Sequence, residues 1–281
     1  MVNGINISVI MKSQYNRWSA ILFMPLFILI GGCEKKEYTL PVEFKLNFAI
    51  KADAILGGSI TIDELGLGLN SIDIRGYREQ GEDVFLTRYY DQGKTFIIKP
   101  GLSNTTEKFD IPQGIYNPIS FSLIFKPDAE ESEIIDDMLD WLEDFEEDDY
   151  LEELQEDLGD IIEDYLEEIT PCIIVKGKFN YNGSTKHILI VVNDPLTFQI
   201  LGKNRNGGTE AILDKNIINN GNLQLNPSYW FSVITPAMLN DAFFGVIDDE
   251  EYIFLNKYVN SQIYSTIFNR MEESTILTIN E

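Results

Sequence analysis

The sequence contains a single histidine, His187, and two cysteines, Cys33 and Cys172, in 281 residues. One imidazole excludes a metal site built from several histidines and leaves one ring for general-base chemistry. The serine-hydrolase motif G-x-S-x-G and the zinc-protease motif H-E-x-x-H do not occur. We therefore predict no catalytic residues, no metal ligands and no cofactor.

Positive charge is also scarce, because 21 Lys and Arg oppose 46 Asp and Glu for a net charge of −25. A surface that binds nucleic acid needs clustered basic residues, so nucleic acid is excluded as a partner. The acids are unevenly placed: 22 of them lie within residues 128–168, which contain no Lys, Arg or His. One segment therefore supplies most of the excess negative charge.

The amino-terminal region has the order of features found in a secretion signal. Lys12 and Arg17 precede an uncharged apolar run at residues 20–30, which is shorter than a typical membrane span. The run ends in Ile30-Gly31-Gly32-Cys33 and resembles the lipobox of bacterial lipoproteins. The resemblance implies that residues 1–32 are a signal peptide, that Cys33 is the lipid-attachment residue and that residues 33–39 form a lipidated tether. Met11 directly precedes the positive region, and we interpret it as the true start.

A lipidated Cys33 would anchor the protein to a membrane through its amino terminus. The expected location is the cell envelope, either the outer membrane or the cell surface of a Gram-negative-type bacterium. Cys172 would then be the only free cysteine, so no intramolecular disulfide can form. Stability must come from packing.

Short alternating segments predict β-structure on both sides of the acidic segment. Apolar residues recur with a period of two in several runs, among them residues 42–50, 60–62, 72–74 and 119–125. Asp91-Gln92-Gly93 has the composition of a hairpin connection. No helix-length periodicity separates these runs, which argues against parallel βαβ units. We predict a mainly β fold in which residues 40–281 form one antiparallel β-sandwich domain.

The acidic segment, residues 128–169, predicts a helical insert. Apolar residues follow spacings of three and four, with a jump of six across residues 146–149, so two helices that fold back as an αα-hairpin would bury both apolar seams. The seams are Ile134, Met138, Trp141 and Phe145, then Leu151, Leu154, Leu158, Ile161 and Tyr165.

The charge of this insert should oppose its folding. Acids four residues apart repel one another, and Gly159 lowers helix propensity. A buried seam, bound cations or a basic partner must offset these effects. Three interpretations remain open: a solvated acidic face, a docking surface for a basic protein partner, or loosely bound divalent cations. A calcium-binding loop is not predicted, because its D-x-[DN]-x-[DN]-G pattern is absent.

Residues 172–192 predict a β-hairpin that turns at Asn182-Gly183. A two-residue turn places Lys178 opposite His187 and separates Cys172 from His187 by about 20 Å, which excludes a Cys–His dyad. The same register places Lys176, Lys178 and His187 on one face. These three residues are our candidate cationic docking patch for the acidic insert, with a solvated sheet edge as the alternative.

A late amphipathic helix is predicted from the four-residue steps of Leu255, Val259, Ile263 and Ile267. The acids at residues 248–251 precede this run and would lie at the positive end of the helix dipole. An earlier short helix is predicted to begin at Thr235-Pro236.

The lipobox, the segment 109–116 that leads into a strand, and the late helix together resemble, loosely, uncharacterised bacterial envelope lipoproteins. These are built on a prealbumin-like or immunoglobulin-like β-sandwich, and the resemblance implies no catalytic residues. We expect a lipid-anchored, non-catalytic binding or structural module at the cell envelope. The alternative is a carboxylate-based enzyme or a glycan-binding protein at the cell surface.

Overall fold

The computed structural model describes residues 40–101, 105–126 and 151–280. The predicted signal peptide, Cys33 and the first helix of the predicted hairpin lie outside these residues. The elements described below belong to the unit formed by residues 41–281.

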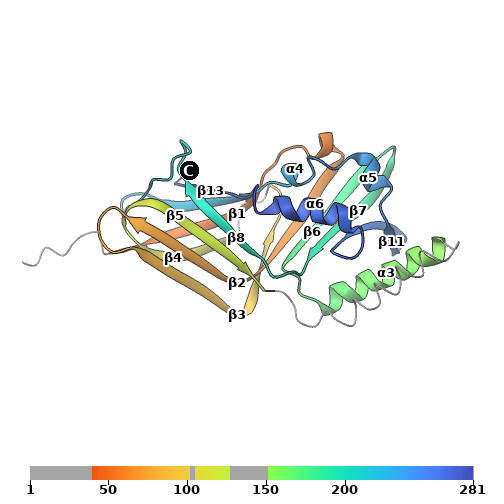
Figure 1. Cartoon of the computed structure of the whole chain (residues 1–281), viewed down its shortest axis with the longest axis horizontal. Helices are drawn as coiled ribbons and strands as arrows, with labels where there is room; N and C mark the ends of the chain where they lie inside the picture. The colour runs from red at the N-terminus through yellow and green to blue at the C-terminus, as the bar shows by residue number, and fades with distance from the viewer. Residues whose placement is uncertain (1–39, 102–104, 127–150, 281) are drawn as a thin grey trace, which may run out of the picture. The chain divides into compact units, whose positions relative to one another are not determined.

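The described residues form a mainly β structure with a few helices (Figure 1). The strands are β1 (Pro41–Ile50), β2 (Ile60–Arg78), β3 (Val84–Ile98), β4 (Thr105–Pro112), β5 (Gly114–Phe125), β6 (Ile173–Tyr181), β7 (Ser184–Val192), β8 (Thr197–Lys203), β9 (Ala211–Leu213), β10 (Asn219–Leu225), β11 (Phe244–Ile247), β12 (Glu250–Leu255) and β13 (Ile276–Ile279). The helices are the short 3₁₀ turn η3 (Leu56–Gly58), α3 (Leu151–Glu168), α4 (Pro227–Trp230), α5 (Pro236–Asn240) and α6 (Ser261–Met271).

All of these strands belong to one mixed sheet in the order β11-β12-β7-β6-β2-β5-β8-β13-β10-β1-β4, with β3 paired to β2 and β9 paired to β5. Most pairs are antiparallel, as predicted. The pairs β1–β10, β7–β12 and β8–β13 are parallel, so the purely antiparallel prediction was wrong. These pairs join strands distant in sequence, and alternation within a strand carries no information about the direction of such a partner.

Strand β2 unites two runs that the sequence suggests are separate. It continues for 19 residues and pairs with β6 through residues 60–67 and with β5 through residues 69–78, while β3 lies along its other edge. The predicted hairpin at Asp91-Gln92-Gly93 was wrong. Residues 90–93 instead form a bulge opposite Asn70, and β3 continues past them along the same partner strand. Gly93 has a φ of 73°, which suits a bulge as well as a turn.

The sheet curls so that β1 and β4 face β2, β3 and β5 across the main core. Phe44 of β1 stacks on Phe121 of β5 with a centroid distance of 5.6 Å, and Phe48 lies 4.8 Å from Phe96 of β3. The alternation of β1 that predicted a half-buried strand is confirmed, because Phe44 and Phe48 are fully buried.

The part of the sheet formed by β6, β7 and β12 is covered on both faces. On one face Ile188 and Ile190 join the main core with residues of α6, and on the other Leu189 and Val191 pack in a second cluster with α3. Figure 1 shows α6 in front of β6 and β7 and α3 beside β11. Burial on both faces explains the unbroken apolar run at the end of β7.

Helix α3 corresponds to the second helix of the predicted insert, and its predicted seam is confirmed at Leu158 and Tyr165. Ile162 is buried in place of the predicted Ile161, and the seam packs on the sheet. Leu158, Ile162 and Tyr165 are buried against Leu189, Val191, Phe254 and Val259, with Ile161 at the margin. Burial of these side chains can offset the charge repulsion within α3 only if the helix lies close to the sheet.

Two glycines permit that approach. The backbone nitrogen of Gly159 lies 2.7 Å from the position that a Cβ atom on Gly245 of β11 would occupy. A Cβ atom on Gly159 would in turn overlap the carbonyl oxygen of Val246. Gly159, which weakens the isolated helix, is therefore required where the helix meets the strand.

The predicted late helix is confirmed as α6, whose Ile263 and Ile267 are buried. Its predicted start was wrong, because Leu255 ends β12 and the acids at residues 248–251 form the turn between β11 and β12 and the first residues of β12. Asp248 and Asp249 have φ values of 50° and 63°, a left-handed backbone that aspartate tolerates in two-residue hairpins. The short helix α5 begins as predicted, with Thr235 Oγ1 accepting from the backbone N–H of Met238 at 3.2 Å.

We predict that Gly159→Ala destabilises the protein although alanine favours helices. The added methyl group must displace α3 from β11, at a cost of about 1–3 kcal/mol. Urea unfolding of the full-length protein in detergent measures this change. Asp160→Ala, at the exposed neighbouring position, is the control and should change stability by less than about 0.5 kcal/mol. A Gly159→Ala protein as stable as wild type would show that the close glycine contact is dispensable.

Candidate functional site

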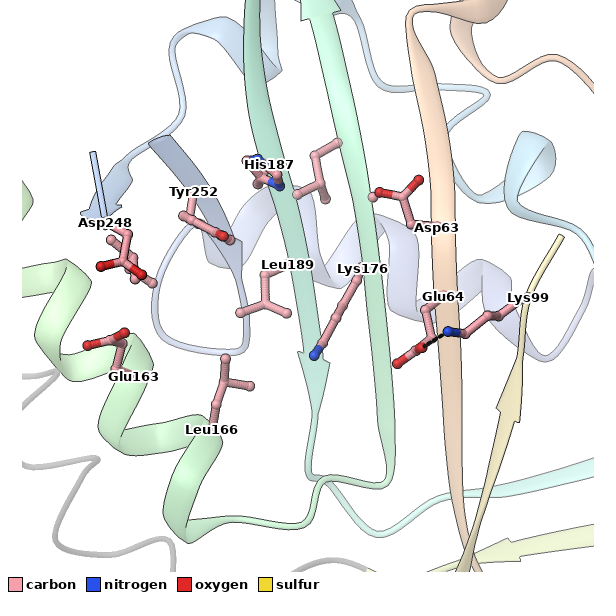
Figure 2. A pocket seen from close by; sticks show the side chains of 13 residues that line it. Asp63, Glu64, Lys99, Glu163, Leu166, Lys176, His187, Leu189, Asp248 and Tyr252 are labelled. Carbon is pink, nitrogen blue, oxygen red and sulfur yellow. Dashed lines mark ion pairs between the residues drawn. The ribbon is translucent and has the colours of Figure 1, made fainter. Parts of the chain in front are cut away.

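A pocket of about 530 Å³ lies between α3, the β11–β12 turn and the face of β6 and β7 on which α3 packs (Figure 2). Strand β2 and Lys99, the residue that follows β3, complete its wall. The lining residues are Asp63, Glu64, Lys99, Glu163, Leu166, Lys176, Gly177, His187, Ile188, Leu189, Ile247, Asp248 and Tyr252. The pocket therefore combines apolar side chains with charges of both signs.

The β6–β7 hairpin that carries the predicted patch is confirmed. Asn182 and Gly183 form its turn with φ values of 51° and 86°, and Lys178 lies opposite His187 as predicted. The same register runs to the pair Ile173 and Val192, so Cys172 and His187 belong to opposite ends of the hairpin. Cys172 is buried, and its thiol donates to the carbonyl oxygen of Asp194 at 3.4 Å.

The structure divides the three residues of the predicted patch. His187 and Lys176 line the pocket, whereas Lys178 does not. The His187 ring stacks on Tyr252 with a centroid distance of 4.7 Å, and its Nε2 lies 2.9 Å from Glu250 Oε2. Local sequence does not reveal this partner, because acids that precede an apolar run suit a helix start as well as a strand beside β7.

Helix α3 lies over the same face as the patch, but its observed contacts there are apolar. Tyr165 meets Phe254 edge-on at 5.9 Å, and Leu166 and Leu189 both line the pocket. Within the described part of the chain, neither Lys176 nor Lys178 forms an ion pair. Direct pairing of these lysines with the acidic insert stays a prediction.

Negative charge converges on one side of the pocket, around Tyr252. Figure 2 shows Glu163 of α3 close to Asp248 of the β11–β12 turn, with Tyr252 and Lys176 toward the sheet. The pKa of Tyr252 is raised, first by burial and then by Glu250, with further contributions from Asp248 and Glu163. At the opposite side Lys99 pairs with Glu64 at 3.1 Å.

Glu163 is one of several acids on α3, and it borders the pocket. Those whose side chains are described are exposed, as are the two aspartates of the β11–β12 turn. We call this set the acidic surface: Glu156, Asp157, Asp160, Glu163, Asp164, Glu167, Asp248 and Asp249. Among the residues that the structure describes, none of these carboxylates lies within 4.0 Å of a lysine or arginine nitrogen.

The described residues place no group of three or more His, Cys, Asp or Glu side chains in an arrangement that could hold a metal ion. None of the helices in the described ranges is both long enough and apolar enough to cross a membrane. No family model, curated protein or solved structure matches this chain. The site must therefore be interpreted from its own chemistry.

We predict that Lys176→Glu lowers the melting temperature more than Lys178→Glu does. Both lysines are exposed on β6, but only Lys176 lines the pocket with Glu64 and Glu163. Reversing its charge should cost roughly 1 kcal/mol, or about 2–4 °C in a chain of this size. Calorimetry at low salt is the measurement. Equal melting temperatures for the two variants would contradict electrostatic docking of the insert on Lys176.

Proposed function

We propose that this protein is a lipid-anchored, non-catalytic binding module of the bacterial cell envelope, and that its acidic surface receives a basic protein partner. The observation that carries the proposal is the meeting of two acidic segments distant in sequence. The acids of α3 and those of the β11–β12 turn lie together because Gly159 and Gly245 allow α3 to contact β11.

The ion pairs that acids form elsewhere on the sheet support this proposal by contrast. Several acids there have basic partners: Lys51 lies 2.7 Å from Asp53, and Lys108 lies 3.1 Å from Glu43. The acidic surface lacks such partners among the described residues, although the protein has bases to supply them. A surface that keeps many carboxylates exposed and close together attracts cationic groups over a longer range than a single ion pair does.

We further propose that the segment before α3 supplies the other helix of an acidic αα-hairpin. The spacing of Ile134, Met138, Trp141 and Phe145 supports this, and its acids would enlarge the acidic surface. In the same proposal the curled sheet is a variant of the β-sandwich, because β1 and β4 pack face to face with β2, β3 and β5. The order Ile30-Gly31-Gly32-Cys33 supports the lipid anchor.

We predict that Cys33→Ser abolishes lipid attachment. Cells that express the wild-type chain should incorporate labelled palmitate into it, and the variant should incorporate none because serine lacks the acceptor thiol. Cys172→Ser, which removes the buried cysteine, is the control and should keep the label. Label retained in Cys33→Ser would contradict the anchor.

We also predict that neutralising α3 weakens binding of a basic probe. Fluorescein-labelled octalysine should bind the full-length protein in detergent at low salt. The quadruple variant Asp160→Asn, Glu163→Gln, Asp164→Asn and Glu167→Gln should bind it at least about tenfold more weakly, because it loses four neighbouring carboxylates. Fluorescence anisotropy measures both affinities.

The matched control removes four exposed acids from other parts of the chain: Glu79→Gln, Glu82→Gln, Asp110→Asn and Glu273→Gln. It has the same net charge as the α3 variant and should bind octalysine nearly as well as wild type. Equal weakening in both variants would show that only total charge matters and would contradict a specific acidic surface. Competition by calcium at millimolar concentration would instead favour divalent cations as the natural occupants.

A further inference from the structure

Large aromatic side chains are exposed on the outer face of β2 and β3. Phe85 and Tyr89 of β3 keep 64% and 69% of their surface exposed, and Tyr77 of β2 keeps 47%. The Tyr77 and Phe85 rings meet edge-on with a centroid distance of 6.3 Å, which places them on the same face. Exposed aromatic residues gathered in one place usually mark a binding surface.

Polar side chains occupy the space between these rings. Thr87, Asp73 and Ser122 follow one another across β3, β2 and β5 in a single row of the sheet. The buried neighbours Ile72 and Ile74 point into the core, so alternation directs Asp73 to the outer face. We call Tyr77, Phe85, Tyr89, Asp73, Thr87 and Ser122 the aromatic face.

Asp73 has an unsatisfied carboxylate oxygen in the middle of this face. Its Oδ1 is buried and has no hydrogen-bond partner among the described residues. A buried polar atom without a partner is costly, so such an atom in a native protein requires an explanation. The χ2 torsion of aspartate has a broad energy minimum, so the carboxylate can turn to meet a ligand donor at little cost.

Sugar rings match this combination of groups. The C–H faces of a pyranose are apolar and stack on aromatic rings, while its hydroxyl groups both donate and accept hydrogen bonds. Phe85 and Tyr89 are four residues apart on one strand, or about 13 Å at 3.3 Å per residue. That separation suits a short oligosaccharide that contacts both rings and the row of polar groups between them.

Charge decides which glycans fit. The aromatic face carries Asp73 and has Arg75 beside it on β2, so its own charge is balanced. The whole chain carries a net charge of −25, which repels polyanionic glycans. A neutral chain meets no such repulsion.

We propose that the aromatic face binds a neutral glycan chain, with Phe85 and Tyr89 stacking on sugar rings and Asp73 accepting a hydrogen bond from a hydroxyl group between them. This site is separate from the acidic surface and does not depend on the basic partner. It assigns a ligand class to side chains that the fold leaves exposed.

The test uses the full-length protein in detergent on a printed array of neutral and anionic oligosaccharides, followed by affinity electrophoresis in gels that contain the best-bound neutral polysaccharide. The variants are Phe85→Ala, Tyr89→Ala, Asp73→Asn and the conservative Tyr89→Phe. Ile218→Ala, which truncates an apolar side chain with 78% exposure elsewhere, is the matched control. Circular dichroism verifies that each variant is folded.

Wild type should bind neutral glycans in preference to anionic ones. Phe85→Ala and Tyr89→Ala should each weaken retardation by about two- to tenfold, as expected for one lost ring-stacking contact, while Tyr89→Phe and Ile218→Ala should resemble wild type. Asp73→Asn should weaken binding without changing the fold. No neutral glycan bound on the array, or equal retardation of wild type and the alanine variants, would overturn the proposal. A dimer that light scattering detects in wild type and not in Tyr89→Ala would also overturn it, because the face would then be covered by a second copy.

Discussion

The continuous pairing of β2 is the constraint on which the rest of the structure depends. This strand hydrogen-bonds to β6 and then β5 along one edge and to β3 along the other, so it joins both parts of the sheet. Leu65 is separated from Ile60 and from Ile72 by odd numbers of positions, which in a regular strand would place it on the opposite face. Register shifts at residues 62–64 and 69–71 allow all three to point into the same core. Such bulges restore inward and outward alternation where a long strand would otherwise lose it.

The docking of α3 on the sheet depends on the balance between charge repulsion within the helix and burial of its apolar side chains. Like charges four residues apart cost a few tenths of a kcal/mol per pair. Burial of a large apolar side chain contributes about 1.5–3 kcal/mol, and Leu158, Ile162 and Tyr165 are all buried. Apolar contact therefore exceeds repulsion, provided that the helix can approach β11. This is why the glycines at positions 159 and 245 matter more than helix propensity does.

The sequence predicts those features that depend on neighbouring residues. The strand alternation of β1 and the Asn182-Gly183 hairpin are confirmed, and the seam of α3 is confirmed at Leu158 and Tyr165, because each follows from local periodicity or turn chemistry. The errors concern long-range choices. Asp91-Gln92-Gly93 has turn composition, but both flanking segments pair with β2, so the chain continues. The acids before α6 suit a helix start, but Asp248 and Asp249 also tolerate the left-handed turn that joins β11 to β12.

The difference between local patterns and long-range contacts also explains why the whole site could not be predicted from the sequence. It identified Lys176 and His187 as members of one face, but the partners of that face come from β2, α3 and β12, which only the fold brings there. The outward side of β2 carries Asp63 at the pocket and Asp73 and Tyr77 at the aromatic face. The acidic surface, which borders the pocket at Glu163 and Asp248, and the aromatic face have different chemistry, since the first is strongly acidic and the second nearly neutral. Binding to the acidic surface must weaken as salt screens its charge, whereas stacking on the aromatic face should be almost indifferent to salt. Strand β2 thus contributes to the pocket and to the aromatic face, and the occupants of the acidic surface and of the aromatic face need not compete.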